Sequence, residues 1–232
     1  MMSSQINSRS FFNQILPAQP CALCGTPSHD GIWCKACAAE LPHLGDNHCP
    51  VCALPTPQGN ICGHCLRHPP PFDHTVAAFA YAFPVDKLVQ ALKFSENLTL
   101  ALQLADALAQ RIDERPAAIV AMPLHPQRLR ERGFNQSELL AQHLARFLGI
   151  PVLPDACTRI RNTAPQSTLP WKERDKNMRK AFTCNLDLQG KHVAVVDDVM
   201  TTGASIGALS ATLRRAGATR ISAWVVARTL PH

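Results

Sequence analysis

The chain has 232 residues, of which 46% are hydrophobic and 17% charged, a balance typical of a soluble globular protein. No apolar run approaches the about 20 residues that cross a membrane, and the first 20 residues lack the apolar centre of a secretory signal. We therefore expect a cytoplasmic protein that does not insert into membranes. The formal net charge of +6 is compatible with a polyanionic partner but does not identify one.

The cysteines are concentrated near the N-terminus, after a flexible leader expected at residues 1–20. Eight of the ten form four C-x2-C pairs in two similar halves, each with nine residues between its pairs. Clusters of four cysteines bind Zn2+ tetrahedrally, so residues 21–68 are predicted to be a zinc-binding module with about two ions. The spacing leaves open whether neighbouring or alternating pairs share an ion, and a redox dithiol is a weaker alternative. The predicted ligands are Cys21, Cys24, Cys34, Cys37, Cys49, Cys52, Cys62 and Cys65.

Residues 72–232 follow a proline-rich linker and alternate between strand and helix patterns. Strands are predicted at 75–83, 117–122, 192–196 and 220–227. Helices are predicted at 85–94, 98–113, 135–148 and 204–216, and the polar residues 163–178 are expected to form a mobile loop. This alternation predicts an α/β fold whose mostly parallel central sheet is flanked by helices on both faces.

The segment VAVVDDVMTTGAS, residues 193–205, carries the strongest functional signal. Its apolar residues predict a buried strand that ends at two acids, where α/β sheets place their ligands. The small residues that follow open a helix, whose free N–H groups and dipole favour an anion. We expect the phosphate contacts to come from Thr201, Thr202, Gly203, Ala204 and Ser205.

Two carboxylates beside a phosphate need a separate role, because they would otherwise repel the ligand. Asp197 and Asp198 could accept hydrogen bonds from the vicinal hydroxyls of a sugar, so a ribose 5-phosphate satisfies both halves of the segment. Magnesium binding is a second use of these acids. The Walker phosphate loop and the G-x-G-x-x-G fingerprint are both absent, which argues against an ordinary ATPase or dinucleotide enzyme.

This segment resembles the motif that binds phosphoribosyl pyrophosphate (PRPP) in type I phosphoribosyltransferases. Three further features resemble the ComF/GntX family of competence-associated proteins: residues 123–136 (PLHPQRLRERGFNQ), the paired cysteines, and Lys93 in ALKF. The resemblance implies the type I phosphoribosyltransferase fold, with PRPP bound together with Mg2+. It also implies that Asp197 and Asp198 hold the ribose and that residues 201–205 surround its 5-phosphate.

The same resemblance implies that two basic segments hold the pyrophosphate. Arg128 and Arg132 are predicted to contact it from the loop after the strand at 117–122, although three arginines compete there. Residues 159–179 resemble the flexible catalytic loop of these folds, from which Arg174 is predicted to act in catalysis with Asp197 and Asp198. The expected reaction transfers phosphoribosyl from PRPP to an acceptor that the sequence does not identify.

Three functions remain open at this stage. One is a PRPP-binding, phosphoribosyltransferase-like protein that acts in DNA uptake or utilisation, with single-stranded DNA and other DNA-uptake proteins as partners. The others are a phosphoribosyltransferase of nucleotide salvage and a PRPP-sensing regulator of nucleotide metabolism. Ordinary salvage is disfavoured, because no segment that would read a nucleobase is evident. We favour the DNA-related function.

Overall fold

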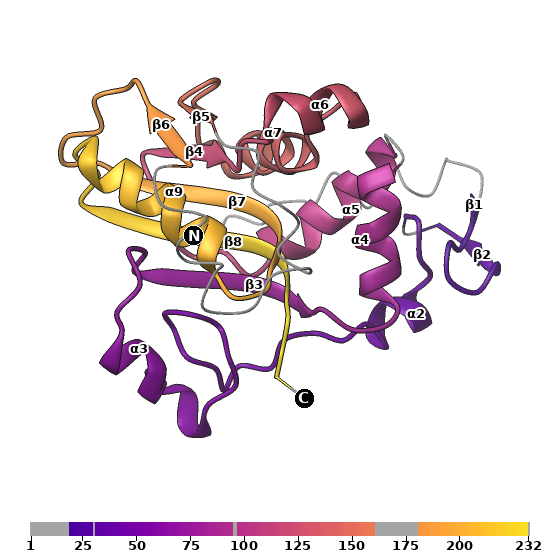
Figure 1. Ribbon diagram of the computed structural model, residues 1–232. Coiled ribbons are helices and arrows are strands. Elements are labelled where there is room, and N and C mark those ends of the chain that lie inside the picture. The colour runs from indigo at the N-terminus through magenta and orange to yellow at the C-terminus, as the bar shows by residue number, and fades with distance from the viewer. Residues whose placement is uncertain (1–18, 30, 95–96, 161–180, 232) are drawn as a thin grey trace, which may run out of the picture. The chain divides into compact units, whose positions relative to one another are not determined.

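A computed structural model describes residues 19–29, 31–94, 97–160 and 181–231 (Figure 1). The chain divides into two compact units, residues 1–41 and 42–232. Most of the expected leader, residues 1–18, and the expected loop at 163–178 lie outside the described residues. None of the helices within the described ranges is long and apolar enough to cross a membrane.

The first unit is small and is built around the first two cysteine pairs. Two short strands pair antiparallel, with Gln19 opposite Ser28, and a single helical turn follows them. A segment of this size buries only a small core of its own, so a metal ion bound by its cysteines would stabilise it. The elements are β1 (Gln19–Pro20), β2 (Pro27–Ser28) and α2 (Lys35–Ala39).

The second unit contains a four-stranded sheet in the order β3-β8-β7-β4, and every neighbouring pair is parallel. The two central strands are almost continuously buried, as expected where helices cover both faces of a sheet. This confirms the predicted α/β class and its parallel sheet. The strands are β3 (His74–Ala80), β4 (Ala118–Ala121), β7 (His192–Met200) and β8 (Arg220–Arg228).

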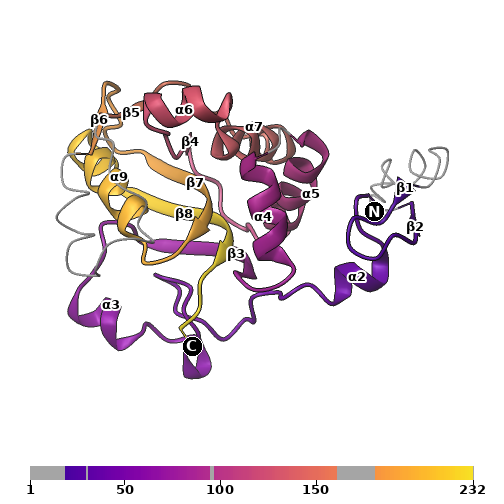
Figure 2. The same cartoon turned by 45° about the vertical axis from the view of Figure 1, so that its right-hand side comes forward.

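Helices cover both faces of this sheet, as Figures 1 and 2 show. On one face α5 packs against α7, and both helices contact the strands. On the other face lies α9, whose Leu209 and Leu213 share a core cluster with Val193 and Val195 of β7. The main helices are α4 (Val85–Phe94), α5 (Leu98–Ala109), α7 (Gln136–Leu148) and α9 (Ala204–Arg215).

Several short elements were not predicted from the sequence. One helix, α6, starts at a proline in its first turn, is capped by the His125 side chain and ends at Gly133 in the left-handed conformation. The two strands β5 and β6 pair antiparallel and place Cys157 opposite Cys184. These elements are η1 (Pro57–Gly59), α3 (Gly63–Arg67), α6 (Pro126–Arg132), β5 (Cys157–Arg159) and β6 (Phe182–Cys184).

The strand that carries the two acids is longer than predicted. The sequence suggested that it ends at residue 196, but β7 continues to Met200 because its pairing with β8 extends to Met200 opposite Arg228. Asp197 and Asp198 therefore belong to the strand, and their side chains project from opposite faces of the pleat. This alternation decides which neighbours each carboxylate meets.

Candidate functional site

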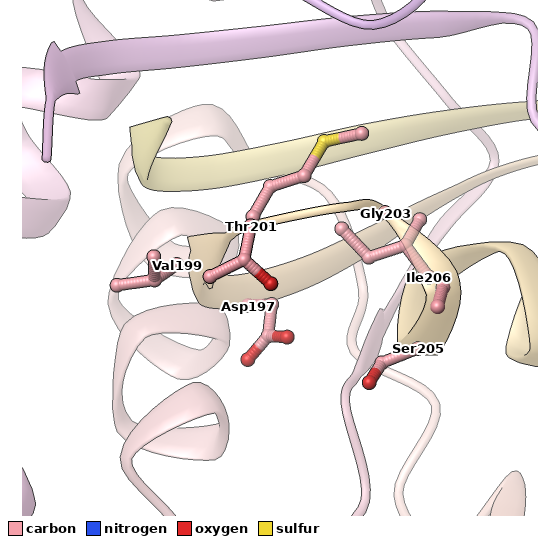
Figure 3. Close-up of a pocket in the computed structure, with 8 residues that line it drawn as sticks. Asp197, Val199, Thr201, Gly203, Ser205 and Ile206 are labelled. Carbon is pink, nitrogen blue, oxygen red and sulfur yellow. The ribbon is translucent and has the colours of Figure 1, made fainter. Parts of the chain in front are cut away.

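A pocket lies where β7 turns into α9, with about 220 Å³ of empty space, part of it open to solvent. Figure 3 shows the Asp197 carboxylate and the Ser205 hydroxyl directed to the same side of this turn. The carboxyl ends of the parallel strands and the start of a helix meet here, which is the usual position of ligands in such sheets. Its lining residues are Asp197, Val199, Met200, Thr201, Gly203, Ala204, Ser205 and Ile206.

The helix start is shaped by Gly203. This residue caps α9 with φ of 81°, and a Cβ atom there would lie 2.8 Å from the Met200 methyl carbon. A side chain at this position would therefore displace the Met200 side chain and strain the start of α9. The Thr202 hydroxyl accepts a hydrogen bond from the Ala204 N–H at 3.3 Å, which orders the turn. The result is a helix N-terminus suited to an anion.

The carboxylate of Asp198 is buried and interacts with side chains of α4 and α7. The Lys93 ammonium of α4 lies 3.1 Å from its Oδ2, and the Gln136 side-chain amide donates to the same oxygen at 3.2 Å. The amide oxygen of Gln136 in turn accepts a hydrogen bond from Arg132 at 2.5 Å. A buried carboxylate that is paired in this way is fixed in orientation.

The carboxylate of Asp197 has a different environment. Its Oδ1 accepts hydrogen bonds from the Ser137 hydroxyl and from the Asp198 N–H, both at 2.9 Å. Burial, together with the negative charge of Asp198, nevertheless raises the pKa of Asp197 to about 7. The two neighbouring acids therefore differ: Asp198 is paired with Lys93, whereas the pKa of Asp197 lies near neutral pH.

Arginines surround the acid pair. Arg128 and Arg132, one helical turn apart on α6, are both half-buried, whereas Arg130 is exposed. Burial lowers the pKa of Arg132, and the charge of Asp198 partly offsets this. Burial also lowers the pKa of Arg159 on β5, where the charge of Asp197 acts in the opposite direction and Arg128 reinforces the decrease. Positive charge is thus gathered near Asp197 and Asp198.

The structure adds residues that the motif analysis did not assign to the site. Gln136 and Ser137 open α7 and were not given a role, while Arg159 was treated only as part of a basic segment. Gln136 lies in the RERGFNQ segment and Lys93 in ALKF, so the resemblance marked both segments without indicating these contacts. The predicted catalytic residue Arg174 lies outside the described residues. The Asn135 side chain caps α7 by accepting a hydrogen bond from the Ser137 N–H.

The eight N-terminal cysteines form two clusters, each made of two neighbouring pairs. The alternative, in which alternating pairs share an ion, is therefore wrong. Within each cluster the four sulfurs lie within 4.8 Å of one another. The Cys24 and Cys34 sulfurs are 3.8 Å apart, and the Cys52 and Cys62 sulfurs are 3.7 Å apart. Tetrahedral zinc with Zn–S bonds of about 2.3 Å places sulfurs about 3.8 Å apart, so both clusters fit the ion.

The two clusters repeat the same local geometry. The Cys34 N–H donates to the Cys21 sulfur, and the Cys62 N–H donates to the Cys49 sulfur, both at 3.3 Å. Such N–H···S bonds stabilise the thiolate form that a metal requires. Repetition of the hydrogen bond in both halves shows that the sequence repeat is also a structural repeat. The first cluster lies in the first unit and the second in residues 42–232.

Comparison with known proteins is consistent with this arrangement. Residues 11–66 match the double zinc ribbon domain family. The DNA utilization protein YhgH of Salmonella typhimurium is 38% identical over 222 residues, which cover 90% of this chain and 97% of the relative. Competence protein F of Haemophilus influenzae is 32% identical over 219 residues, covering 90% of each chain.

One similar solved structure is the glutamine PRPP amidotransferase from B. subtilis, complexed with ADP and GMP. It is 20% identical, with a TM-score of 0.42, and the match covers 60% of this chain and 30% of the other. The sequence relatives carry the assignment, because both exceed 30% identity over almost their whole length. The chain belongs to the ComF/GntX family, together with competence protein F and the YhgH proteins.

Proposed function

We propose that this protein binds PRPP at the pocket between β7 and α9. The observation that carries the proposal is that the N-terminus of α9 and the Asp197 carboxylate line one pocket, with the Asp198 carboxylate next to Asp197 in the same strand. A ribose 5-phosphate matches both features, because its phosphate accepts from N–H and hydroxyl groups while its ring hydroxyls donate to carboxylates. The N–H and hydroxyl groups of residues 201–205, which we call the phosphate loop, hold the phosphate, and Asp197 and Asp198 hold the ribose.

The pyrophosphate of PRPP needs positive charge on the side of the acids away from the phosphate loop. Arg132 and Arg159 are half-buried and are attracted to Asp198 and Asp197, respectively. The charge of Arg128 acts on both of these arginines. These side chains can hold the pyrophosphate through charge-assisted hydrogen bonds. The carboxylate oxygens of Asp197 and Asp198 are also ligands that Mg2+ accepts, and the ion would neutralise part of the pyrophosphate charge.

The chemistry that follows from such a site is phosphoribosyl transfer. An acceptor displaces pyrophosphate at the anomeric carbon of the ribose, and the protein supplies position and charge stabilisation without a covalent nucleophile. Asp198 is suited to hold the ribose, because Lys93 and Gln136 fix the orientation of its carboxylate. Arg174 is proposed to approach the pyrophosphate from the segment beyond β5.

The process in which the protein acts is inferred from its relatives. Their names refer to DNA utilization and to competence. We place this protein in DNA uptake or utilisation in the cytoplasm, with single-stranded DNA and other DNA-uptake proteins as partners. The positive net charge and the basic residues around the site favour contact with a phosphate backbone.

Calorimetric titration of the zinc-loaded protein with PRPP and Mg2+ tests the ligand. The double variant Asp197→Asn, Asp198→Asn should weaken PRPP binding at least about 100-fold, because two charge-assisted hydrogen bonds to the ribose are lost. The same change at the exposed Asp113 is the control and should leave affinity unaltered. Equal affinity in the double variant would contradict the ribose assignment, and no binding by the unaltered protein would contradict the proposal as a whole.

A second titration tests the DNA assignment. A single-stranded oligonucleotide should bind with an affinity that falls steeply with salt, and prior binding should change the PRPP affinity if the two ligands act in one process. Binding of PRPP without any binding of the oligonucleotide would contradict the DNA function. Release of pyrophosphate on addition of a free nucleobase would instead support nucleotide salvage.

A further inference from the structure

One buried arginine connects the second cysteine cluster to the phosphate loop. Arg228 ends β8 and is only 3% exposed. Its Nε donates to the Cys52 carbonyl at 2.7 Å, and its terminal nitrogen donates to the carbonyls of Met200 at 2.9 Å and of Thr201. A single guanidinium therefore holds a metal-ligand turn and the first residues of the phosphate loop at the same time.

The charge of Arg228 also needs a partner, because burying an isolated cation is costly. Within the part of the chain that the structure describes, its oxygen acceptors are all backbone carbonyls, and the Cys52 side chain is a further hydrogen-bond partner. Four thiolates around one Zn2+ carry a net charge of −2, so a loaded second cluster supplies the missing counter-charge.

The second cluster is built into the sheet unit. The Thr75 hydroxyl of β3 donates to the Val51 carbonyl at 2.6 Å, and the Thr75 N–H donates to the Pro50 carbonyl at 2.9 Å. Cys49 and Cys52 share a core cluster with Met200. A change in the metal-ligand turn is therefore transmitted through packed side chains and hydrogen bonds.

We propose that Arg228 is a positioning residue through which metal in the second cluster sets the geometry of the phosphate loop. With zinc bound, the Cys52 turn fixes the guanidinium, which fixes the Met200 and Thr201 carbonyls and aims the following N–H groups at the ligand. The inference rests on the proposed phosphate-binding role of this loop. Metal and phosphate binding are then coupled, and each ligand tightens the other.

The experiment compares the full-length protein with Arg228→Met, which keeps the length of the side chain but removes its charge and donors. Both are made with Cys21→Ser and Cys24→Ser, so that zinc remains only in the second cluster. Chelator competition should show zinc affinity reduced about 10–100-fold in Arg228→Met, as expected for loss of a group that supports metal ligands. Hydrogen exchange at residues 199–206 should accelerate by a similar factor.

Ribose 5-phosphate serves as the ligand probe. Its dissociation constant should rise about tenfold or more in Arg228→Met, and zinc removal from the unaltered cluster should have the same effect. The control Arg214→Met removes another arginine that contacts the chain through backbone carbonyls and Asp73, and it should change neither zinc affinity nor exchange at residues 199–206. Unchanged zinc affinity and exchange in Arg228→Met would overturn the proposal.

Failure of the proposed function can be recognised separately. If the unaltered protein does not bind ribose 5-phosphate or PRPP, the ligand assignment fails, while zinc affinity and exchange still report the coupling. If Arg228→Met does not fold, zinc is titrated into the zinc-free protein that retains Arg228. Slower exchange at residues 199–206 on zinc binding then supports the coupling, and exchange that does not respond to zinc contradicts it.

Discussion

Replacement of Asp197 by asparagine should stabilise the protein at neutral pH while removing a ligand contact. The pKa of Asp197 is raised to about 7 by burial and by the charge of Asp198. An aspartate in the unfolded chain titrates near about 3.9. The folded state therefore keeps a proton that the unfolded state releases between these two values, and ionising the folded site is unfavourable.

The sign and size of the effect follow from this difference. Below about pH 4 the residue is protonated in both the folded and the unfolded state, so it does not change the free energy of unfolding. Between about pH 4 and 7 this residue lowers the free energy of unfolding by about 1.4 kcal/mol per pH unit. The total loss reaches up to about 4 kcal/mol and stays constant above about pH 7. Asparagine retains the oxygen that accepts from Ser137 but cannot ionise, so Asp197→Asn should recover most of this loss.

Urea unfolding of the zinc-loaded protein from pH 4 to 8.5 measures the effect. The free energy of unfolding of Asp197→Asn should equal that of the unaltered protein near pH 4 and exceed it by an increasing amount up to pH 7. The exposed Asp113→Asn controls for the same chemical change at a solvated position. A difference independent of pH, or a variant less stable at pH 8, would refute the reasoning about the acid pair.

Two further predictions concern stability away from the pocket. Burial alone would raise the pKa of Glu114, but interactions led by His74, with a hydrogen bond from Trp224 at 2.7 Å, hold it at about 2. Glu114→Gln should therefore lower the free energy of unfolding by up to about 3 kcal/mol at pH 7, measured by urea unfolding. The difference from the unaltered protein should shrink as the pH falls from about 4.3 toward 2. Gly217→Ala should cost about 1–3 kcal/mol, because a Cβ there lies 2.8 Å from the Gln189 backbone at φ of 100°. Its urea midpoint should fall while PRPP affinity is unchanged, and an unaltered midpoint would contradict the clash.

The sequence by itself determined the features that depend on local spacing. The C-x2-C pairs predicted the eight cysteines that gather into two clusters, because two thiolates from one tight turn are recognisable without knowledge of the fold. The parallel sheet followed from apolar runs that alternate with helix-period segments. The phosphate loop was also local, since strand, acids and helix start lie within 13 consecutive residues, 193–205. The predicted end of its strand, at residue 196, was nevertheless wrong, because pairing with β8 extends β7 to Met200.

Only the tertiary structure decided which distant side chains meet. Gln136 reaches Asp198 across 62 positions of sequence, and Arg228 reaches the Cys52 carbonyl across 176. Neither contact has a signature in local spacing, because strand order and register bring these segments together. The pairing of the cysteines into neighbouring halves was likewise left open by spacing. The physical reason is that sequence periodicity reports which face a residue occupies, whereas packing determines what lies opposite that face.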